Sequence, residues 1–227
     1  MKTIRNERYQ ESYDVETLDN GLRVVIWHKP GYARSLFMMA TPLGAMDICQ
    51  VDEHGTQCVY PAGIAHFLEH KLFESEDGDA FTRYAAIGAS ANAYTSFETT
   101  RYLFSCTENA EKALEILLDF VQSPYFTAQT VEKEQGIIGQ EIKMYDDDPQ
   151  WRVLFNLLRA LYHTHPIKDD IAGTVESIAE ITPEYLYRCY NTFYNLNNMA
   201  LCVSGSCNAA EVLALCDKML KQSAPVQ

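Results

Sequence analysis

The N-terminal part of the chain predicts a β-hairpin, and this hairpin is the feature that most limits how the chain can fold. Residues 12–18 alternate polar and apolar side chains with a period of two, and residues 22–27 form a second, mostly apolar stretch. Asn20-Gly21 lies between them and can supply the positive φ angles of a two-residue hairpin turn. Because an isolated hairpin is barely stable in water, it requires further strands and a covering layer.

The rest of the chain contains further strand patterns and many helix patterns. Strands are predicted at residues 35–43, 89–95, 100–107 and 199–204. Helices are predicted at residues 61–73, 79–87, 108–121, 127–145, 151–162, 182–190 and 208–220. This order indicates an α+β two-layer domain, with a mainly antiparallel sheet and helices packed on one face. No shift in composition divides the chain, so we expect residues 1–227 to form a single domain with frayed ends at 1–11 and 222–227.

Charge and cysteine content exclude several classes of function. The 18 Lys and Arg against 31 Asp and Glu give a formal net charge of −13. Nucleic acid and anionic membranes are therefore not expected as main partners, since both need a basic surface. No apolar run approaches the roughly 20 residues of a membrane span. The 7 cysteines are scattered without a Cys-x-x-Cys pair, so a reducing cytoplasm is the expected location. We expect the closest pair, Cys202 and Cys207, to be small core residues.

Residues 66–70, His-Phe-Leu-Glu-His, carry the strongest chemical signal. On a helix, His66 and His70 lie one turn apart on the same face, where two imidazoles can bind one Zn²⁺. Glu69 lies beside them and can reach a water molecule on the metal without being a ligand. This order of residues is the inverzincin signature. The alternative is a surface helix with two histidines and a salt-bridging glutamate.

A zinc peptidase site needs a third protein ligand and an open position for water. The best-placed downstream carboxylates are Glu134 and Glu141, which are seven residues apart and share one face of a predicted helix. One of them can bind the metal while the other orients a histidine or a backbone group. Without the histidines, both would be interpreted as ordinary solvated helix residues.

Residues 63–70, Gly-Ile-Ala-His-Phe-Leu-Glu-His, resemble the zinc motif of the pitrilysin/insulinase family of inverzincin peptidases. In that family a distant downstream glutamate completes the zinc site. Glu141, 71 residues after His70, matches this glutamate, and Glu134 matches a second one that supports the site. The resemblance thus implies one Zn²⁺ per chain, held by His66, His70 and Glu141, with Glu69 as the catalytic base.

A second resemblance concerns the substrate. Residues 92–96, Asn-Ala-Tyr-Thr-Ser, are similar to the family segment that forms an edge strand and pairs with bound peptide. The resemblance implies that an extended peptide pairs with Ala89, Ser90, Ala91, Asn92, Ala93 and Tyr94. Ordinary core packing of these small residues is the alternative. Residues 66–74 with 77–79 resemble the YmfH-like bacterial members most.

The resemblance covers residues 12–215 and only the first, zinc-bearing half of the family's architecture. Family members have two or more similar halves that face each other across a chamber. The implied activity is therefore a zinc-dependent endopeptidase that needs a second homologous domain or subunit for full activity. The alternative is a non-catalytic binding or scaffold subunit of a two-lobed assembly. A zinc hydrolase of small non-peptide molecules is a third possibility, and it would have a closed pocket.

Overall fold

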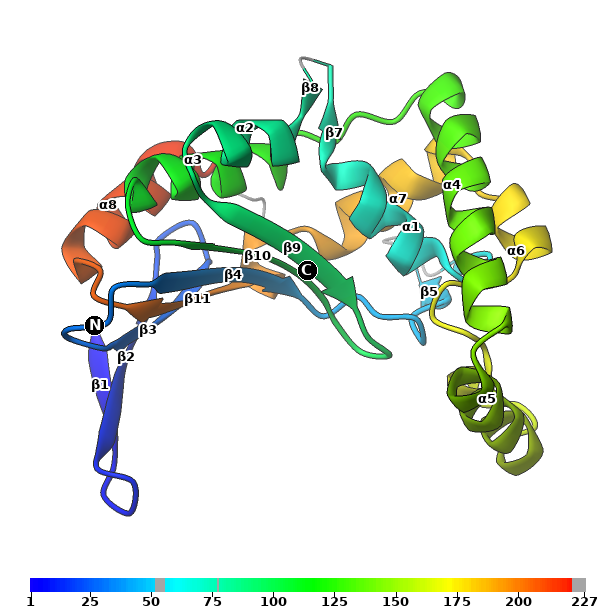
Figure 1. Ribbon diagram of the computed structural model, residues 1–227, viewed down its shortest axis with the longest axis horizontal. Coiled ribbons are helices and arrows are strands. Elements are labelled where there is room, and N and C mark those ends of the chain that lie inside the picture. The colour runs from blue at the N-terminus through cyan, green and yellow to red at the C-terminus, as the bar shows by residue number, and fades with distance from the viewer. Residues whose placement is uncertain (52–55, 77, 222–227) are drawn as a thin grey trace.

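A computed structural model describes residues 1–51, 56–76 and 78–221 of the chain. A seven-stranded sheet with the order β1-β2-β3-β11-β4-β10-β9 forms its centre (Figure 1). Its strands are β1 (Lys2–Asn6), β2 (Glu11–Thr17), β3 (Arg23–His28), β4 (Ser35–Thr41), β9 (Ser90–Thr95), β10 (Thr100–Cys106) and β11 (Ala200–Gly205). Among the paired strands of this sheet in the described residues, only β3 and β11 run parallel, so the prediction of a mainly antiparallel sheet in an α+β fold is confirmed.

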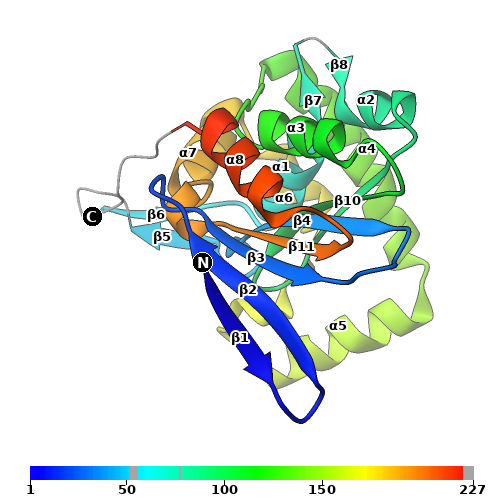
Figure 2. The ribbon, with the colours of Figure 1, turned by 90° about the vertical axis from the view of Figure 1, so that its left-hand side faces the viewer.

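Most helices cover one face of this sheet, as Figures 1 and 2 show. The helices are α1 (Ile64–Leu72), α2 (Ala80–Ala86), α3 (Ala110–Phe120), α4 (Ala128–Asp146), α5 (Pro149–Leu161), α6 (Val175–Ala179), α7 (Pro183–Phe193) and α8 (Ala209–Met219). Two short hairpins, β5–β6 (Cys49–Val51, Gln57–Val59) and β7–β8 (Glu74–Ser75, Gly78–Asp79), and two 3₁₀ turns (Pro166–Lys168, Leu196–Asn198) complete the described chain. The core lies between sheet and helices, where Phe37 of β4 stacks on Phe104 of β10 with ring centroids 4.7 Å apart. In the described part of the chain, no helix combines the length and apolarity needed to cross a membrane.

The predicted N-terminal hairpin is present as β2 and β3. Asp14 pairs with Ile26, and the turn closes where the Gly21 amide donates to the Leu18 carbonyl. Gly21 has φ +93°, and a Cβ there would lie 1.9 Å from the Asn197 side chain. Both the backbone conformation and the close contact therefore require glycine in this turn.

Residues 1–11 were expected to be frayed, and this prediction is wrong. Lys2 to Asn6 form β1, which pairs with β2 from Lys2↔Val15 to Asn6↔Glu11. Pairing of β2 with β3 leaves the other edge of β2 open, and the preceding segment satisfies its backbone groups. The other predicted frayed end, residues 222–227, lies outside the described residues, as does residue 77 of the YmfH-like segment.

Cys202 was expected in the core, and the structure places it on the opposite face of the sheet. Leu201 and Val203 of β11 point into the core. Cys202 lies between them, so its side chain points to the other face of the sheet and is exposed. Cys207 is half-buried and packs against the core. All 7 cysteines are free thiols.

Candidate metal centre and active site

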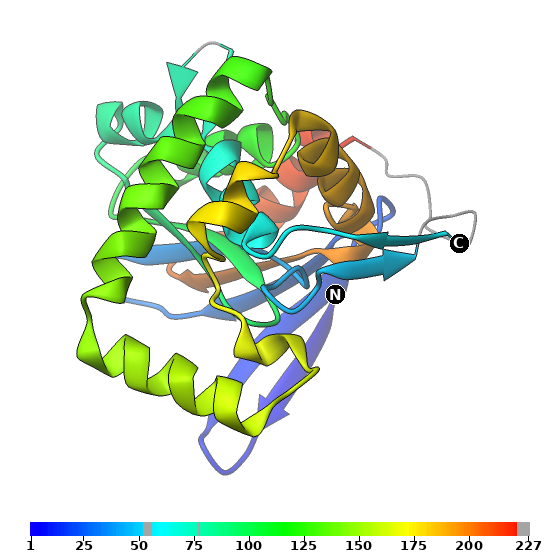
Figure 3. The same ribbon diagram turned by 90° about the vertical axis from the view of Figure 1, so that its right-hand side faces the viewer.

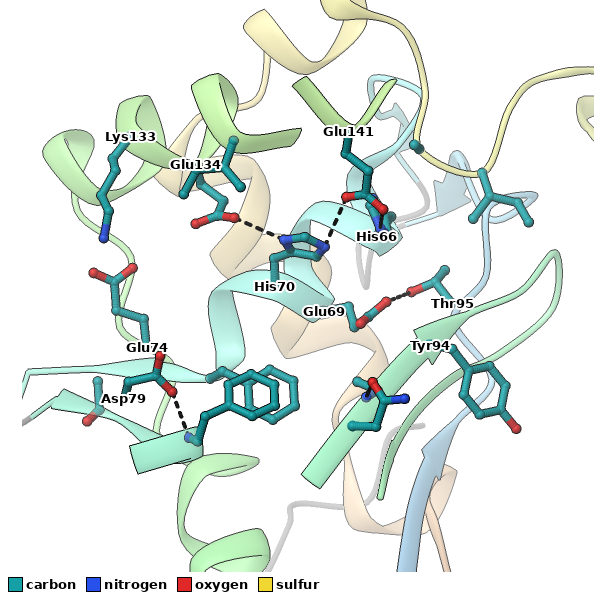
Figure 4. A pocket seen from close by; sticks show the side chains of 18 of the residues that line it. His66, Glu69, His70, Glu74, Asp79, Tyr94, Thr95, Lys133, Glu134 and Glu141 are labelled. Carbon is teal, nitrogen blue, oxygen red and sulfur yellow. Dashed lines mark hydrogen bonds and ion pairs between the residues drawn. The ribbon is translucent and has the colours of Figure 1, made fainter. Parts of the chain in front are cut away.

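Helix α1 is held in place by its buried apolar residues and by a close backbone contact at its N-terminal end. Ile64, Phe67, Leu68 and Leu72 are all almost fully buried. Gly63 precedes the helix with φ +91°, and a Cβ there would lie 2.4 Å from the Ala172 carbonyl oxygen. This packing leaves the polar face of α1, with His66, Glu69 and His70, directed toward α4 and β9 (Figure 4).

Helix α4 brings its two glutamates to the same place. Thr127 forms a capping box at the start of the helix with Thr130, and Val131, Ile138 and Ile142 anchor it in the core. Glu134 and Glu141 then face α1, as their contacts with the histidines show.

The three predicted ligands converge on one point. His66 Nε2 lies 3.7 Å from Glu141 Oε1, and His70 Nε2 lies 3.5 Å from Glu141 Oε2. One donor atom from each of the three residues lies within 4.8 Å of the other two. Donors bound tetrahedrally to one Zn²⁺ at about 2.1 Å are separated by roughly 3.4 Å. Two imidazole nitrogens and one carboxylate at these separations fit a catalytic zinc site.

A hydrogen bond behind His70 orients this ligand. His70 Nδ1 lies 3.0 Å from Glu134 Oε1 (Figure 4). When Nδ1 donates its proton to this carboxylate, the lone pair of Nε2 points toward Glu141. Such carboxylate–histidine pairs are the usual outer support of a metal ligand. Among the described residues, His66 Nδ1 has no hydrogen-bond partner.

The environment drives the two histidines in opposite directions. Burial is the larger cause and the neighbouring His70 the smaller cause that lower the pKa of His66 to about 3, so its imidazole is neutral. Burial also acts to lower the pKa of His70, but the hydrogen bond that His70 donates to Glu134 and the charges of Glu69, Glu134 and Glu141 outweigh burial and raise that pKa. The neutral form of each imidazole is the form that binds a metal, so protons and metal compete at this site.

Glu69 lies beside the candidate ligands but does not belong to the donor cluster of His66, His70 and Glu141. Its carboxylate accepts a hydrogen bond of 2.7 Å from the Thr95 hydroxyl group of β9. Burial raises its pKa, although the Thr95 hydrogen bond acts in the opposite direction. A carboxylate with a raised pKa is suited to take a proton from water and return it later. The sequence analysis did not assign Thr95 this role, because the contact joins residues 26 positions apart.

Glu141 is supported by three other residues that the sequence analysis did not identify. The Tyr145 hydroxyl group lies 3.2 Å from Glu141 Oε1. Trp151 stacks on Tyr145, and its indole donates to Asp170. A sequence signal existed for Tyr145, since positions i and i+4 of a helix are neighbours. Asp170 had none.

The site opens into a cavity of about 740 Å³. Strand β9 forms one border, and it is an edge of the main sheet because β10 is its one partner there. Residues 90–94 of the predicted peptide-binding segment lie in β9, whereas Ala89 immediately precedes it. Asn92, Ala93, Tyr94 and Thr95 line the cavity, and the stacked Phe73 and Phe81 line it farther along.

A sequence profile of the insulinase family (Peptidase family M16) matches residues 58–175, slightly more than half of the chain. The chain belongs to the insulinase family of peptidases. The zinc protease YmfH of Bacillus subtilis (strain 168) is 50% identical to it over 215 residues, which are 94% of this chain and 50% of that protein.

Solved structures of insulinase-family proteins agree with this assignment. An M16-like peptidase from Alicyclobacillus acidocaldarius superposes with a TM-score of 0.88 at 45% identity, covering 93% of this chain and 51% of that one. An inactive M16 domain from Pseudomonas fluorescens has a TM-score of 0.79 at 16% identity, covering 95% of this chain and 52% of that one, and it shares the fold alone. The chain spans about half the length of these relatives.

Proposed function

We propose that this chain is the zinc-bearing lobe of an insulinase-family endopeptidase. The observation that carries the proposal is the convergence of one donor atom each from His66, His70 and Glu141 within 4.8 Å. Glu69 directly precedes His70 on α1. When bound, Zn²⁺ supplies Lewis acidity, which makes water a better nucleophile near neutral pH. The three ligand residues would hold one such ion.

The chain's own residues account for the remaining steps. Glu69 takes a proton from the attacking water and passes it to the leaving amine, while Thr95 holds its carboxylate in place. An extended peptide adds to the free edge of β9 through backbone hydrogen bonds, which give affinity with little dependence on side chains. The wide cavity beside this edge favours a peptide substrate over a small molecule in a closed pocket.

Full activity requires a second lobe in this proposal, because the relatives are about twice as long as the matched region. A non-catalytic scaffold lobe is the rival function, since an inactive M16 domain from Pseudomonas fluorescens has the same fold. We further propose a reducing compartment, the cytoplasm, which the 7 free thiols support.

The test uses this chain and a two-lobe chimera, in which it replaces the first half of Bacillus subtilis YmfH and is followed by that protein's second half. Wild type should bind one equivalent of zinc, and His70→Ala none. Glu69→Gln should keep the zinc and lose cleavage of an unstructured peptide by the chimera. Folded wild-type chain without zinc affinity contradicts the proposal, and zinc binding with equal cleavage by Glu69→Gln contradicts the role of Glu69.

A further inference from the structure

A four-residue turn between α5 and α6 contacts both sides of the candidate metal site. It consists of residues 170–173, Asp-Ile-Ala-Gly, and we call it the 170–173 turn. Figure 3 shows this part of the chain, in yellow, leading from α5 up to α6. Ile171 and Ala172 line the active-site cavity. The turn therefore borders the space in which a peptide would bind.

The Asp170 carboxylate fixes the shape of the turn and joins it to α5. Its Oδ1 accepts a hydrogen bond of 3.1 Å from the Ala172 amide, and the Asp170 carbonyl accepts one of 2.9 Å from the Gly173 amide. An aspartate that bonds the backbone two residues ahead in this way stabilises a tight turn. Its Oδ2 accepts the 2.5 Å hydrogen bond from the Trp151 indole. One carboxylate therefore holds α5 and the 170–173 turn in a fixed relation.

On the side of Glu141, the contacts run from Asp170 through two aromatic rings. The indole of Trp151 stacks on Tyr145, with an angle of 21° between the ring planes. The Tyr145 hydroxyl group donates to Glu141 Oε1. A shift of the indole would therefore tilt the Tyr145 ring and move the donor that orients Glu141. We call this path the glutamate arm.

On the side of the histidines, the turn packs directly on the start of α1. A Cβ on Gly63 would lie 2.4 Å from the Ala172 carbonyl oxygen. In return, a Cβ on Gly173 would lie 2.4 Å from the Ala62 carbonyl oxygen. Both glycines have positive φ angles, +91° and +76°, so the two backbones interlock without side chains between them. The Ser177 hydroxyl group adds a hydrogen bond of 2.8 Å to the Ala62 carbonyl.

This glycine interlock reaches the histidines through the first turn of α1. The Gly63 carbonyl accepts a hydrogen bond of 2.9 Å from the Phe67 amide, which closes that turn. His66 follows Gly63 by three residues, and His70 lies one helical turn farther on. Closely packed backbone atoms have no rotamers with which to absorb a shift, so a displaced 170–173 turn displaces the start of α1. We call this path the histidine arm.

Metal binding requires that both arms be placed accurately. The residues of such a site must be held within about 0.5 Å of the productive geometry by packing and by outer hydrogen bonds. The two histidines come from α1, whereas Glu141 comes from α4, so their relative position depends on what joins these helices. Asp170 bonds to both arms at once, to Trp151 with one oxygen and to Ala172 with the other.

We propose that Asp170 is a positioning residue of the metal site, which sets the distance between Glu141 and the two histidines by holding both arms on one carboxylate. This inference rests on the zinc site of the proposed function and adds the residue that couples its two helices. In this role Asp170 touches neither the metal nor the peptide. It acts through Trp151 on one side and through Ala172 on the other.

Asp170→Asn tests this role in the single chain. The asparagine has nearly the same shape and can still accept from the Ala172 amide, but its NH2 group then faces the indole N–H, so two donors meet. We expect the zinc dissociation constant, measured by competition with a chromogenic chelator, to rise about tenfold. Asp169→Asn removes the same charge one residue earlier and should bind zinc like wild type. Equal zinc affinity of folded Asp170→Asn and wild type would overturn the proposal.

Trp151→Phe is the second variant, and it applies where Asp170→Asn does not fold. It keeps an aromatic ring beside Tyr145 but removes the indole N–H, so Asp170 loses its hold on the glutamate arm. The zinc dissociation constant should again rise about tenfold. Wild-type affinity in this folded variant would also overturn the proposal.

A double-variant cycle separates positioning from a general loss of stability. If Asp170 acts on Glu141 through Tyr145, the effects of Asp170→Asn and Tyr145→Phe on zinc affinity are not independent. Two independent tenfold losses would multiply to about a hundredfold, whereas we expect the double variant to lose only about 10- to 30-fold. A hundredfold loss would show that Asp170 does not act along the glutamate arm and would overturn the coupling.

Amide hydrogen exchange tests the histidine arm without metal. Asp170→Asn should speed exchange of the Phe67 amide about tenfold, because that amide bonds to a residue of the glycine interlock. Amides of α8, and the Phe67 amide in Asp169→Asn, should exchange at wild-type rates. Unchanged exchange at Phe67 in Asp170→Asn would overturn the coupling. A wild-type chain that binds no zinc refutes the proposed function, whereas zinc binding that Asp170→Asn leaves intact refutes this inference alone.

Discussion

Tyr145 donates a hydrogen bond of 3.2 Å from its hydroxyl group to Glu141 Oε1. Trp151 stacks on the Tyr145 ring at a centroid distance of 4.7 Å, and its indole donates to Asp170 Oδ2 at 2.5 Å. The carboxylate that faces both histidines is therefore supported from behind by residues of the α4–α5 junction and of the segment before α6. The surroundings of the candidate metal site therefore include Trp151 of α5 as well as residues of α1 and α4.

Removing the Tyr145 hydroxyl group should weaken zinc binding. In Tyr145→Phe the ring still stacks on Trp151, but Glu141 loses a donor that orients it. We expect the zinc dissociation constant to rise about tenfold, as is usual when an outer contact of a metal ligand is lost. Competition with a chromogenic chelator measures this change. Tyr32→Phe, at an exposed tyrosine, is the control and should bind zinc like wild type. Equal affinities in all three proteins would show that this hydrogen bond does not support the ligand.

Glu134→Gln tests the support behind His70. The amide can still fill the space beside His70 Nδ1, but it lacks the negative charge that stabilises the Nδ1–H tautomer. We expect zinc affinity to fall about 10- to 100-fold. Glu132→Gln makes the same chemical change two residues earlier, on an exposed position of α4, and should have no effect. The difference between these variants separates a local contact from a general loss of charge.

The metal-free protein should lose stability as pH falls, and His66 is one cause. Its imidazole has a pKa of about 3 in the folded chain, against about 6.5 when unfolded. Below pH 6.5 the unfolded state therefore binds a proton that the folded state does not, and the free energy of unfolding falls by about 1.4 kcal/mol per pH unit. His70 acts in the opposite sense, because its pKa is raised on folding and its contribution is lost as pH rises.

His66→Gln removes the pH-dependent contribution of His66 to stability and keeps that of His70. Urea unfolding of the metal-free proteins at pH 7, 6 and 5 gives their free energies of unfolding. From pH 7 to pH 5, the variant should lose about 1.5–2 kcal/mol less of this free energy than wild type. His28→Gln, at an exposed histidine of β3, should follow wild type. Parallel pH curves for wild type and His66→Gln would refute the role of buried His66.

Features set by spacing along one helix or one hairpin were predictable from the sequence, and features set by packing between elements were not. His66 and His70 share a helix face, as do Glu134 and Glu141, because their separations of four and seven residues match the helix repeat. The side of β11 on which Cys202 lies was missed, because strand alternation does not say which face receives the helices. The pairing of β1 with β2 and the contact between Trp151 and Asp170 depend on how separate segments meet, and no local pattern encodes that.

The cavity should select peptides with basic side chains. Among the residues that the structure describes, its lining carries six carboxylates, Glu69, Glu74, Glu76, Asp79, Glu134 and Glu141, against one lysine, Lys133. Glu76 is exposed, lies between β7 and β8 and is not one of the candidate ligands, so its charge can be removed without removing a ligand. In the two-lobe chimera, Glu76→Gln should lower kcat/KM for a lysine-rich peptide about two- to fivefold relative to an uncharged one, in line with an exposed charge pair. The preference should weaken at high salt. Glu211→Gln on α8, outside the cavity, removes the same charge from the chain and should leave the preference intact. Equal loss in both variants would assign the effect to net charge instead of the cavity.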